Sequence, residues 1–166
     1  MKVRHKLNKV REMTIQEKIK TIDWTNHNGC NKYYNSEKCQ KSLLELILLN
    51  KESKITNTYD NVLFSIGNNH CGTYYPVILD ALDIIIEVAR NAQNEIARNC
   101  ALEIISDLSF SFYPDAENYK SISTEELYEF VQNQISCFIW SYDFEFESDR
   151  NQKLLNDLKE YFQKRK

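Results

Sequence analysis

The amino-acid sequence predicts an all-α protein in which about seven helices pack as antiparallel pairs. The chain has 166 residues but only three glycines and two prolines, too few for the many tight turns of a β-sandwich or β-barrel. Apolar residues recur at every third or fourth position along most of the chain, which is the period of an amphipathic helix. Because this length suits one domain, we expect a single helical domain over residues 1–166.

Three helices are expected in the first half of the chain. Thr14 and Glu17 have the spacing of a capping box, which predicts that a helix begins there. Asparagines concentrate between residues 26 and 35 and predict a loop, after which Ser36 is expected to cap a second helix. A third helix is expected to end at Gly67, since glycine tolerates the left-handed conformation that is common at helix C-termini.

Four further helices are expected in the second half. Pro76 suits the first turn of the fourth helix, because its missing N–H has no partner in that turn. The fifth helix has the clearest amphipathic pattern, over residues 96–108. Ser123 and Glu126 have the spacing of a second capping box, which opens the sixth helix, and Asp149 is expected to cap the seventh.

The charges are distributed unevenly along the chain. The formal net charge is −3, but residues 1–20 carry seven Lys and Arg against two Glu, so the remaining 146 residues have a net charge of −8. Residues 1–12 therefore form a basic leader on an acidic body. Nucleic-acid binding is not expected, since it requires clustered Lys and Arg on the folded surface. A protein partner with a basic surface is favoured instead.

The cysteines predict a reducing environment and no metal site. Their number, five, is odd, their spacing is irregular, and the first residues lack the apolar core of a secretory signal. His27, Cys30 and Cys39 lack a fourth ligand and match no common zinc pattern. No phosphate-binding glycine motif is found, and no apolar stretch is long enough to cross a membrane. We therefore expect a cytoplasmic protein with no cofactor, no metal and no membrane span.

The connector before Pro76 is rich in side chains suited to recognition. It offers amides, an imidazole and phenols, which give large contact area and adaptable hydrogen bonds. The candidate partner-binding residues here are Asn68, Asn69, His70, Tyr74 and Tyr75. The alternative interpretation is a structural turn, in which His70 and Asn68 satisfy helix-end groups and a tyrosine fills the core.

A second candidate partner-binding segment alternates aromatic and acidic side chains. An extended backbone would place its aromatic residues on one side and its carboxylates on the other. Such a segment suits a basic partner, because charge steers the encounter and aromatic anchors supply buried area. The alternative is a solvated inter-helix loop whose aromatic side chains pack inward. The candidate residues are Tyr142, Asp143, Phe144, Glu145, Phe146, Glu147 and Asp149.

Part of the sequence resembles a group of poorly characterised bacterial HEAT-like proteins. The resemblance lies in Leu63-Phe-Ser-Ile-Gly-Asn-Asn-His-Cys-Gly-Thr-Tyr-Tyr-Pro76, in the apolar stretch 82–89, and in Ala101-Leu-Glu-Ile-Ile-Ser-Asp-Leu108. These segments span roughly a third of the chain. The resemblance implies a short HEAT/ARM-like αα-superhelix and a binding role, and some relatives are plausible immunity proteins against polymorphic toxins.

We therefore expect a protein–protein interaction module that is not an enzyme. The favoured type is an immunity or antitoxin protein that neutralises its partner by masking it. The expected partner is a basic toxin domain. The first alternative is a general helical-repeat scaffold or adaptor that binds peptides. The second is a small hydrolase-like enzyme that uses His70 and Cys71 as base and nucleophile. Adjacent side chains usually point apart, and the sequence places no third orienting group beside them. The oligomeric state stays open.

Overall fold

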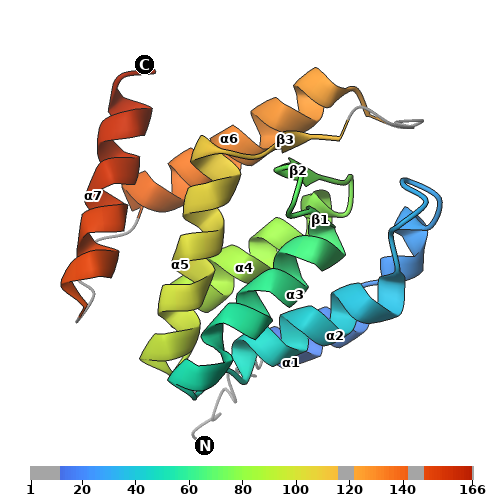
Figure 1. The fold of residues 1–166 in the computed structure, drawn as a ribbon, viewed down its shortest axis with the longest axis horizontal. Helices are drawn as coiled ribbons and strands as arrows, with labels where there is room; N and C mark the ends of the chain where they lie inside the picture. The colour runs from blue at the N-terminus through green and yellow to red at the C-terminus, as the bar shows by residue number, and fades with distance from the viewer. Residues whose placement is uncertain (1–11, 116–121, 142–147, 166) are drawn as a thin grey trace, which may run out of the picture.

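Seven α-helices make up most of the computed structural model, which describes residues 12–115, 122–141 and 148–165 (Figure 1). Within these residues the prediction of a mostly helical protein with seven helices is confirmed. Two short 3₁₀ helices, η1 (Trp24–His27) and η2 (Glu52–Lys54), lie in the links. The α-helices are α1 (Ile15–Thr21), α2 (Ser36–Ile47), α3 (Ile55–Ile66), α4 (Ile78–Asn91), α5 (Glu95–Phe110), α6 (Thr124–Ser141) and α7 (Asp149–Gln163).

Two predicted capping boxes are confirmed. The Thr14 hydroxyl accepts the N–H of Glu17, whose carboxylate accepts the N–H of Thr14. Ser123 and Glu126 exchange the same two hydrogen bonds at the start of α6. These boxes were predictable because every atom in them lies within one helical turn.

Other helix starts differ from the expectation by one or two residues. Asn35, not Ser36, is the N-cap of α2, because its side-chain oxygen accepts the N–H of Lys38. Ser148 precedes α7, so Asp149 is the first helical residue and not the cap. Pro76 lies in a turn just before α4, where its carbonyl accepts the N–H of Leu79.

The core is built around α4 and α5, the green and yellow helices at the centre of Figure 1. Helix α4 packs against α1, α2, α5 and α6, and α5 packs against α2, α3, α6 and α7 as well. Both helices present fully buried apolar side chains, among them Leu82, Ile85, Ala101 and Ile104. Burial of each large aliphatic side chain contributes roughly 1.5–3 kcal/mol, so this central pair supplies much of the stability.

A small three-stranded sheet replaces the loop expected between α3 and α4. Strand β1 (Gly67–Asn68) pairs antiparallel with β2 (Thr73–Tyr74), and β2 pairs in parallel with β3 (Tyr113–Pro114). The reversal between β1 and β2 contains Gly72, whose φ of +63° favours glycine. Two-residue strands carry no periodic signal, which explains why the sequence pattern predicts only a loop here.

Gly67 ends α3 in a different way from the one expected. Its φ is −174°, an extended conformation that any residue adopts, so no left-handed cap is formed. The position is instead restricted by space. A Cβ atom there would lie 1.9 Å from the carbonyl oxygen of Thr73 on the paired strand. Glycine therefore allows β2 to approach β1 directly at the end of α3.

Candidate functional site

The turn between β1 and β2 is held by its own side chains and presents two others to solvent. The side-chain oxygen of Asn68 accepts the N–H groups of His70 (3.1 Å) and Cys71 (3.3 Å). Asn69 donates its side-chain amide to the carboxylate of Asp60 on α3, at 3.0 Å. These bonds hold the backbone of His70 and Cys71, and both residues are exposed.

Tyr74 and Tyr75, two of the predicted recognition residues, belong to the core. Their exposed fractions are 0% and 2%, so neither side chain is available to a partner. Burial raises the pKa of Tyr75 to about 12. Its backbone N–H donates to the carbonyl of Ile66, which joins the end of β2 to α3. For these two residues the structure corrects the recognition interpretation and agrees with the alternative, in which tyrosine fills the core.

His70 connects the turn to an exposed aromatic side chain on α3. Its ring packs edge-on against Phe64, with 4.8 Å between the ring centres and 69° between the planes. Phe64 is 42% exposed although it is large and apolar. The same phenylalanine borders a groove of about 330 Å³ between α2 and α3. The turn and the groove therefore form one continuous surface, which we call the α2–α3 face.

The floor of the groove is made by two serines. Ser42 on α2 and Ser65 on α3 are 3% and 6% exposed, and their hydroxyl oxygens lie 2.6 Å apart. Each hydroxyl also lies within hydrogen-bonding distance of a carbonyl in the preceding turn of its own helix. Small side chains at both positions leave space above them, and their hydroxyls are satisfied without help from a ligand.

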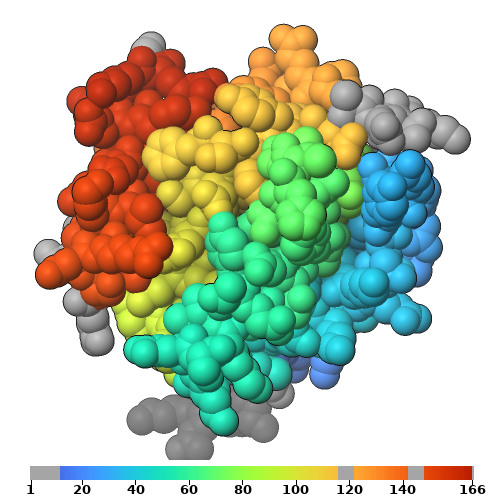
Figure 2. All heavy atoms as spheres, viewed as in Figure 1, coloured from blue at the N-terminus to red at the C-terminus, as the bar shows by residue number. Residues whose placement is uncertain are grey.

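The rim of the groove combines aromatic and basic side chains. Tyr33 is 69% exposed, and the ammonium of Lys32 lies 4.9 Å from the centre of its ring. Lys38 and Lys41 line the α2 side. The Lys41 ammonium lies 3.9 Å from the Glu45 carboxylate, and such an exposed pair is weak. In Figure 2, α2 (blue) and α3 (teal to green) lie side by side on the face turned to the viewer.

Sequence reasoning missed the groove because no local pattern reports it. Ser42 and Ser65 are 23 positions apart and meet only when α2 packs against α3. The sequence does not show that the aromatic side chains of Tyr33 and Phe64 are exposed, since most aromatic residues are expected in the core. The available sequence signal was the position of Phe64, a large apolar residue four positions before the predicted recognition segment.

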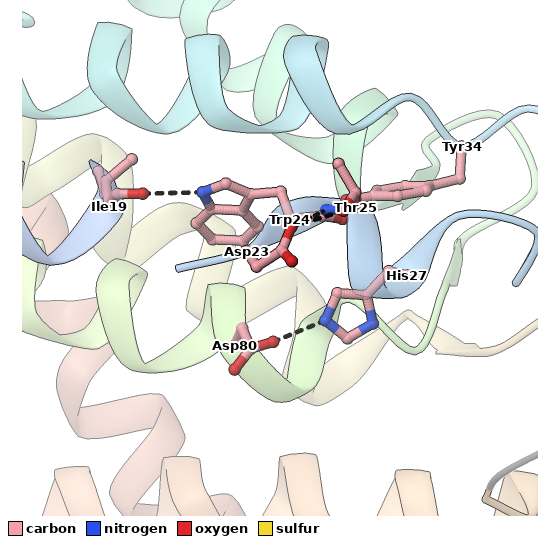
Figure 3. A network of polar contacts seen from close by, with 7 residues as sticks. All are labelled: Ile19, Asp23, Trp24, Thr25, His27, Tyr34 and Asp80. Atoms are coloured by element: carbon pink, nitrogen blue, oxygen red, sulfur yellow. Dashed lines mark hydrogen bonds and ion pairs between the residues drawn. The ribbon is translucent and has the colours of Figure 1, made fainter. Parts of the chain in front are cut away.

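His27 has a structural partner in place of the metal considered for it. Its Nε2 lies 2.6 Å from the carboxylate of Asp80 on α4. Figure 3 shows the two side chains facing each other. In the same network, the indole N–H of Trp24 donates to the carbonyl of Ile19, and the phenol of Tyr34 donates to the carbonyl of Trp24. These bonds attach the segment after α1 to α1 and α4.

Cys39, another residue considered as a metal ligand, is a buried thiol. Cys39 is 0% exposed, and burial raises its pKa to about 12. Across residues 12–115, 122–141 and 148–165 no group of three or more His, Cys, Asp or Glu side chains is arranged to hold a metal ion.

The second predicted segment falls mostly outside the described residues. Tyr142, Asp143, Phe144, Glu145, Phe146 and Glu147 are not described, so their proposed role stays a prediction. Asp149 is exposed at the first position of α7. Next to it, the guanidinium of Arg150 lies 3.2 Å from the Glu103 carboxylate of α5, which joins the start of α7 to α5.

A separate aromatic cluster joins α5, α6 and α7. Phe110 packs edge-on against Tyr161, and Tyr113 stacks on Tyr128 with 5.8 Å between ring centres. The guanidinium of Arg165 lies over the rings of Tyr128 and Tyr161 and donates to both phenol oxygens. These intramolecular contacts hold the end of α7 against α6.

None of the described helices has both the length and the apolar composition needed to cross a membrane. Comparisons with protein-family models, with curated proteins and with solved structures find no match for this chain.

Proposed function

We propose that this chain is a protein–protein interaction module that neutralises its partner by masking it, as immunity and antitoxin proteins do. The observation that supports this proposal is the α2–α3 face, where the exposed rings of Tyr33 and Phe64 border a groove. Exposed aromatic side chains around a concave surface are typical anchors of protein interfaces. His70, packed on Phe64, extends this surface to the β1–β2 turn.

The hydrogen bonds that hold the β1–β2 turn support a binding role. Asn68 fixes the turn through two hydrogen bonds, and Asn69 attaches it to α3. Side chains that are already hydrogen-bonded in the unbound protein have less conformational entropy to lose when a partner docks. The Tyr142–Glu147 segment and Asp149 would provide a second, acidic contact for a basic partner, as the sequence predicts.

The helix pairs are also compatible with the proposed HEAT-like αα-superhelix. Helices α2 and α3 pack together, as do α4 and α5, and each pair is joined by a short link. In such an array the pairs present one continuous surface to a partner. The superhelix remains part of the proposal.

The proposal is tested with the protein encoded beside this gene as the candidate partner. Co-expression should protect cells from that protein, and the double substitution Tyr33→Ala with Phe64→Ala should weaken binding by about 2 kcal/mol or more, as at interface hot spots. Isothermal titration calorimetry measures the affinity. Leu48→Ala is the matched control, since Leu48 is 61% exposed at the end of α2 and does not line the groove.

Replacement of Asp143, Glu145, Glu147 and Asp149 by alanine tests the acidic segment separately. Unchanged affinity and unchanged protection would remove that segment from the proposal. Unchanged affinity in both the aromatic and the acidic variants would reject masking by either surface.

A scaffold or adaptor that binds peptides is the second candidate, and the groove between α2 and α3 favours it. Binding experiments with proteins from native cells separate the two functions. One tight partner encoded next to this gene supports masking, whereas several weak partners that compete for the groove support an adaptor.

A further inference from the structure

We infer that the groove between α2 and α3 binds an acidic segment of the partner, which inserts an apolar side chain between Tyr33 and Phe64. This inference rests on the proposed function, because it names the chemistry of the segment that the α2–α3 face would recognise. The groove volume of about 330 Å³ lies at the lower end of the range of about 300–1,000 Å³ for ligand sites. That size suits an anchoring side chain.

The walls and the floor of the groove indicate that the side chain it accepts is apolar. Tyr33 and Phe64 are 69% and 42% exposed, so both rings have apolar surface that a partner can cover. Ser42 and Ser65 beneath them are paired with each other and leave no unsatisfied hydroxyl in the floor. An apolar side chain therefore enters without separating a buried polar group from its partner.

The acidic character of the segment is indicated by the charges on the rim. Lys38 and Lys41 line the groove, and the Lys32 ammonium lies over the ring of Tyr33. The one carboxylate among the lining residues, Glu45, accepts a hydrogen bond from Asn61 and lies near Lys41. This local excess of positive charge contrasts with the net charge of −3 of the whole chain. At physiological ionic strength charges act over about 8 Å, so the local excess decides which ligand is attracted.

A peptide suits this groove better than a nucleic acid. A phosphate backbone needs a continuous row of cations, whereas two lysines line this groove and Glu45 lies among them. An extended peptide instead presents a single apolar side chain with carboxylates on both sides of it. The lysines would pair with these carboxylates while the aromatic rings cover the anchor.

In the experiment, probe molecules are titrated into the isotopically labelled full chain, and nuclear magnetic resonance monitors the backbone amide signals. The probes are the blocked peptide Glu-Asp-Leu-Asp-Glu, its counterparts Lys-Lys-Leu-Lys-Lys and Glu-Asp-Ser-Asp-Glu, and a short oligothymidylate. The acidic leucine peptide should shift the amide signals of Ser42, Phe64 and Ser65 and bind at least about tenfold more tightly than the other probes. Its affinity should also fall as salt is added.

Charge reversal on the rim completes the test. Lys38→Glu with Lys41→Glu should weaken the acidic peptide at least about tenfold. Lys51→Glu with Lys54→Glu makes the same charge change at exposed positions outside the groove, so it should change the affinity less than about twofold. Circular dichroism establishes that both variants are folded.

Several results would overturn the inference. They are equal binding of the lysine peptide, preferred binding of oligothymidylate, equal effects of the two charge reversals, or no shift of the groove signals at about 1 mM peptide. If the partner protein loses affinity for the Tyr33→Ala and Phe64→Ala variant while the acidic peptide does not bind, only this inference fails. If that variant keeps full affinity for the partner, the proposed use of the α2–α3 face fails.

Discussion

At the scale of single residues, Gly67 determines how the turn between β1 and β2 is attached to the helices. It ends α3 and begins β1, and its Cα faces the backbone of the opposite strand at close range. A methyl group there would lie 1.9 Å from the Thr73 carbonyl oxygen and 2.7 Å from the Tyr74 Cα. Both neighbours are backbone atoms, so they cannot move aside by a rotamer change.

Gly67→Ala is therefore expected to lower the free energy of unfolding by about 3 kcal/mol or more, the upper part of the range for overpacking. Gly29→Ala is the matched control. No atom lies within 4 Å of a Cβ at Gly29, but its φ is +83°, so this variant should lose only about 1–2 kcal/mol. Urea denaturation measures both. An equal or smaller loss at Gly67 would contradict the steric explanation.

A comparison of the sequence predictions with the structure shows which residue roles can be predicted from the sequence. Thr14 and Ser123 were predicted correctly as caps because their partners are three positions away. Tyr74 was a candidate recognition residue, and the alternative was that a tyrosine here fills the core. Tyr74 is fully buried, because its environment is supplied by segments that are distant in the sequence. The pairing of Ser42 with Ser65 has no sequence signal at all. Local hydrogen bonds are predictable, whereas burial and grooves depend on packing between helices.

At the scale of elements, the start of α6 is coupled to pH through its capping box. Two hydrogen bonds to the Glu126 carboxylate, first from the backbone N–H and then from the hydroxyl of Ser123, lower the pKa of Glu126 below its ordinary value of 4.5. A lowered pKa in the folded state means that the ionised carboxylate stabilises the helix above the unfolded pKa. This contribution disappears as the pH falls through the folded pKa.

Glu126→Gln should therefore lower the thermal midpoint near neutral pH, and the difference from the unmodified chain should shrink as the pH falls below about 4.5. The control is Glu125→Gln, which removes an equal charge from the same first turn but does not belong to the box. Thermal unfolding followed by circular dichroism at a series of pH values gives both curves. If the loss in thermal midpoint depends on pH in the same way for both variants, the cause is the loss of a negative charge near the helix N-terminus and not the capping box.

At the scale of the whole molecule, the helical architecture was predictable and the sheet was not. The helices α4 and α5 have long apolar stripes that recur with the helical period, and both are central in the fold. The strands β1, β2 and β3 are two residues each, so their position depends on how the ends of α3, α5 and α6 come together. The chain therefore specifies its helices locally, whereas the small sheet and the α2–α3 groove form only through the complete fold.

The cysteines offer a test of that complete fold, because their predicted reactivities differ widely. Cys71 and Cys137 are exposed, whereas burial raises the pKa of both Cys39 and Cys100 from 9.0 to about 12. A rise of this size lowers the thiolate fraction at pH 8 about 1,000-fold, and steric protection slows the reaction further.

Iodoacetamide at pH 8 should therefore modify Cys71 and Cys137 first, as peptide mass spectrometry of short time points would measure. Cys30 is half-buried with a raised pKa, so it should react more slowly than these two and faster than the buried pair. In urea all five thiols should react at similar rates, which is the control for intrinsic reactivity. Early labelling of Cys39 or Cys100 in the native chain would mean that α2 or α5 is not packed in the core as described. Early labelling of Cys39 in particular would remove the structural basis of the α2–α3 groove, because Ser42 of the same helix forms its floor together with Ser65 of α3.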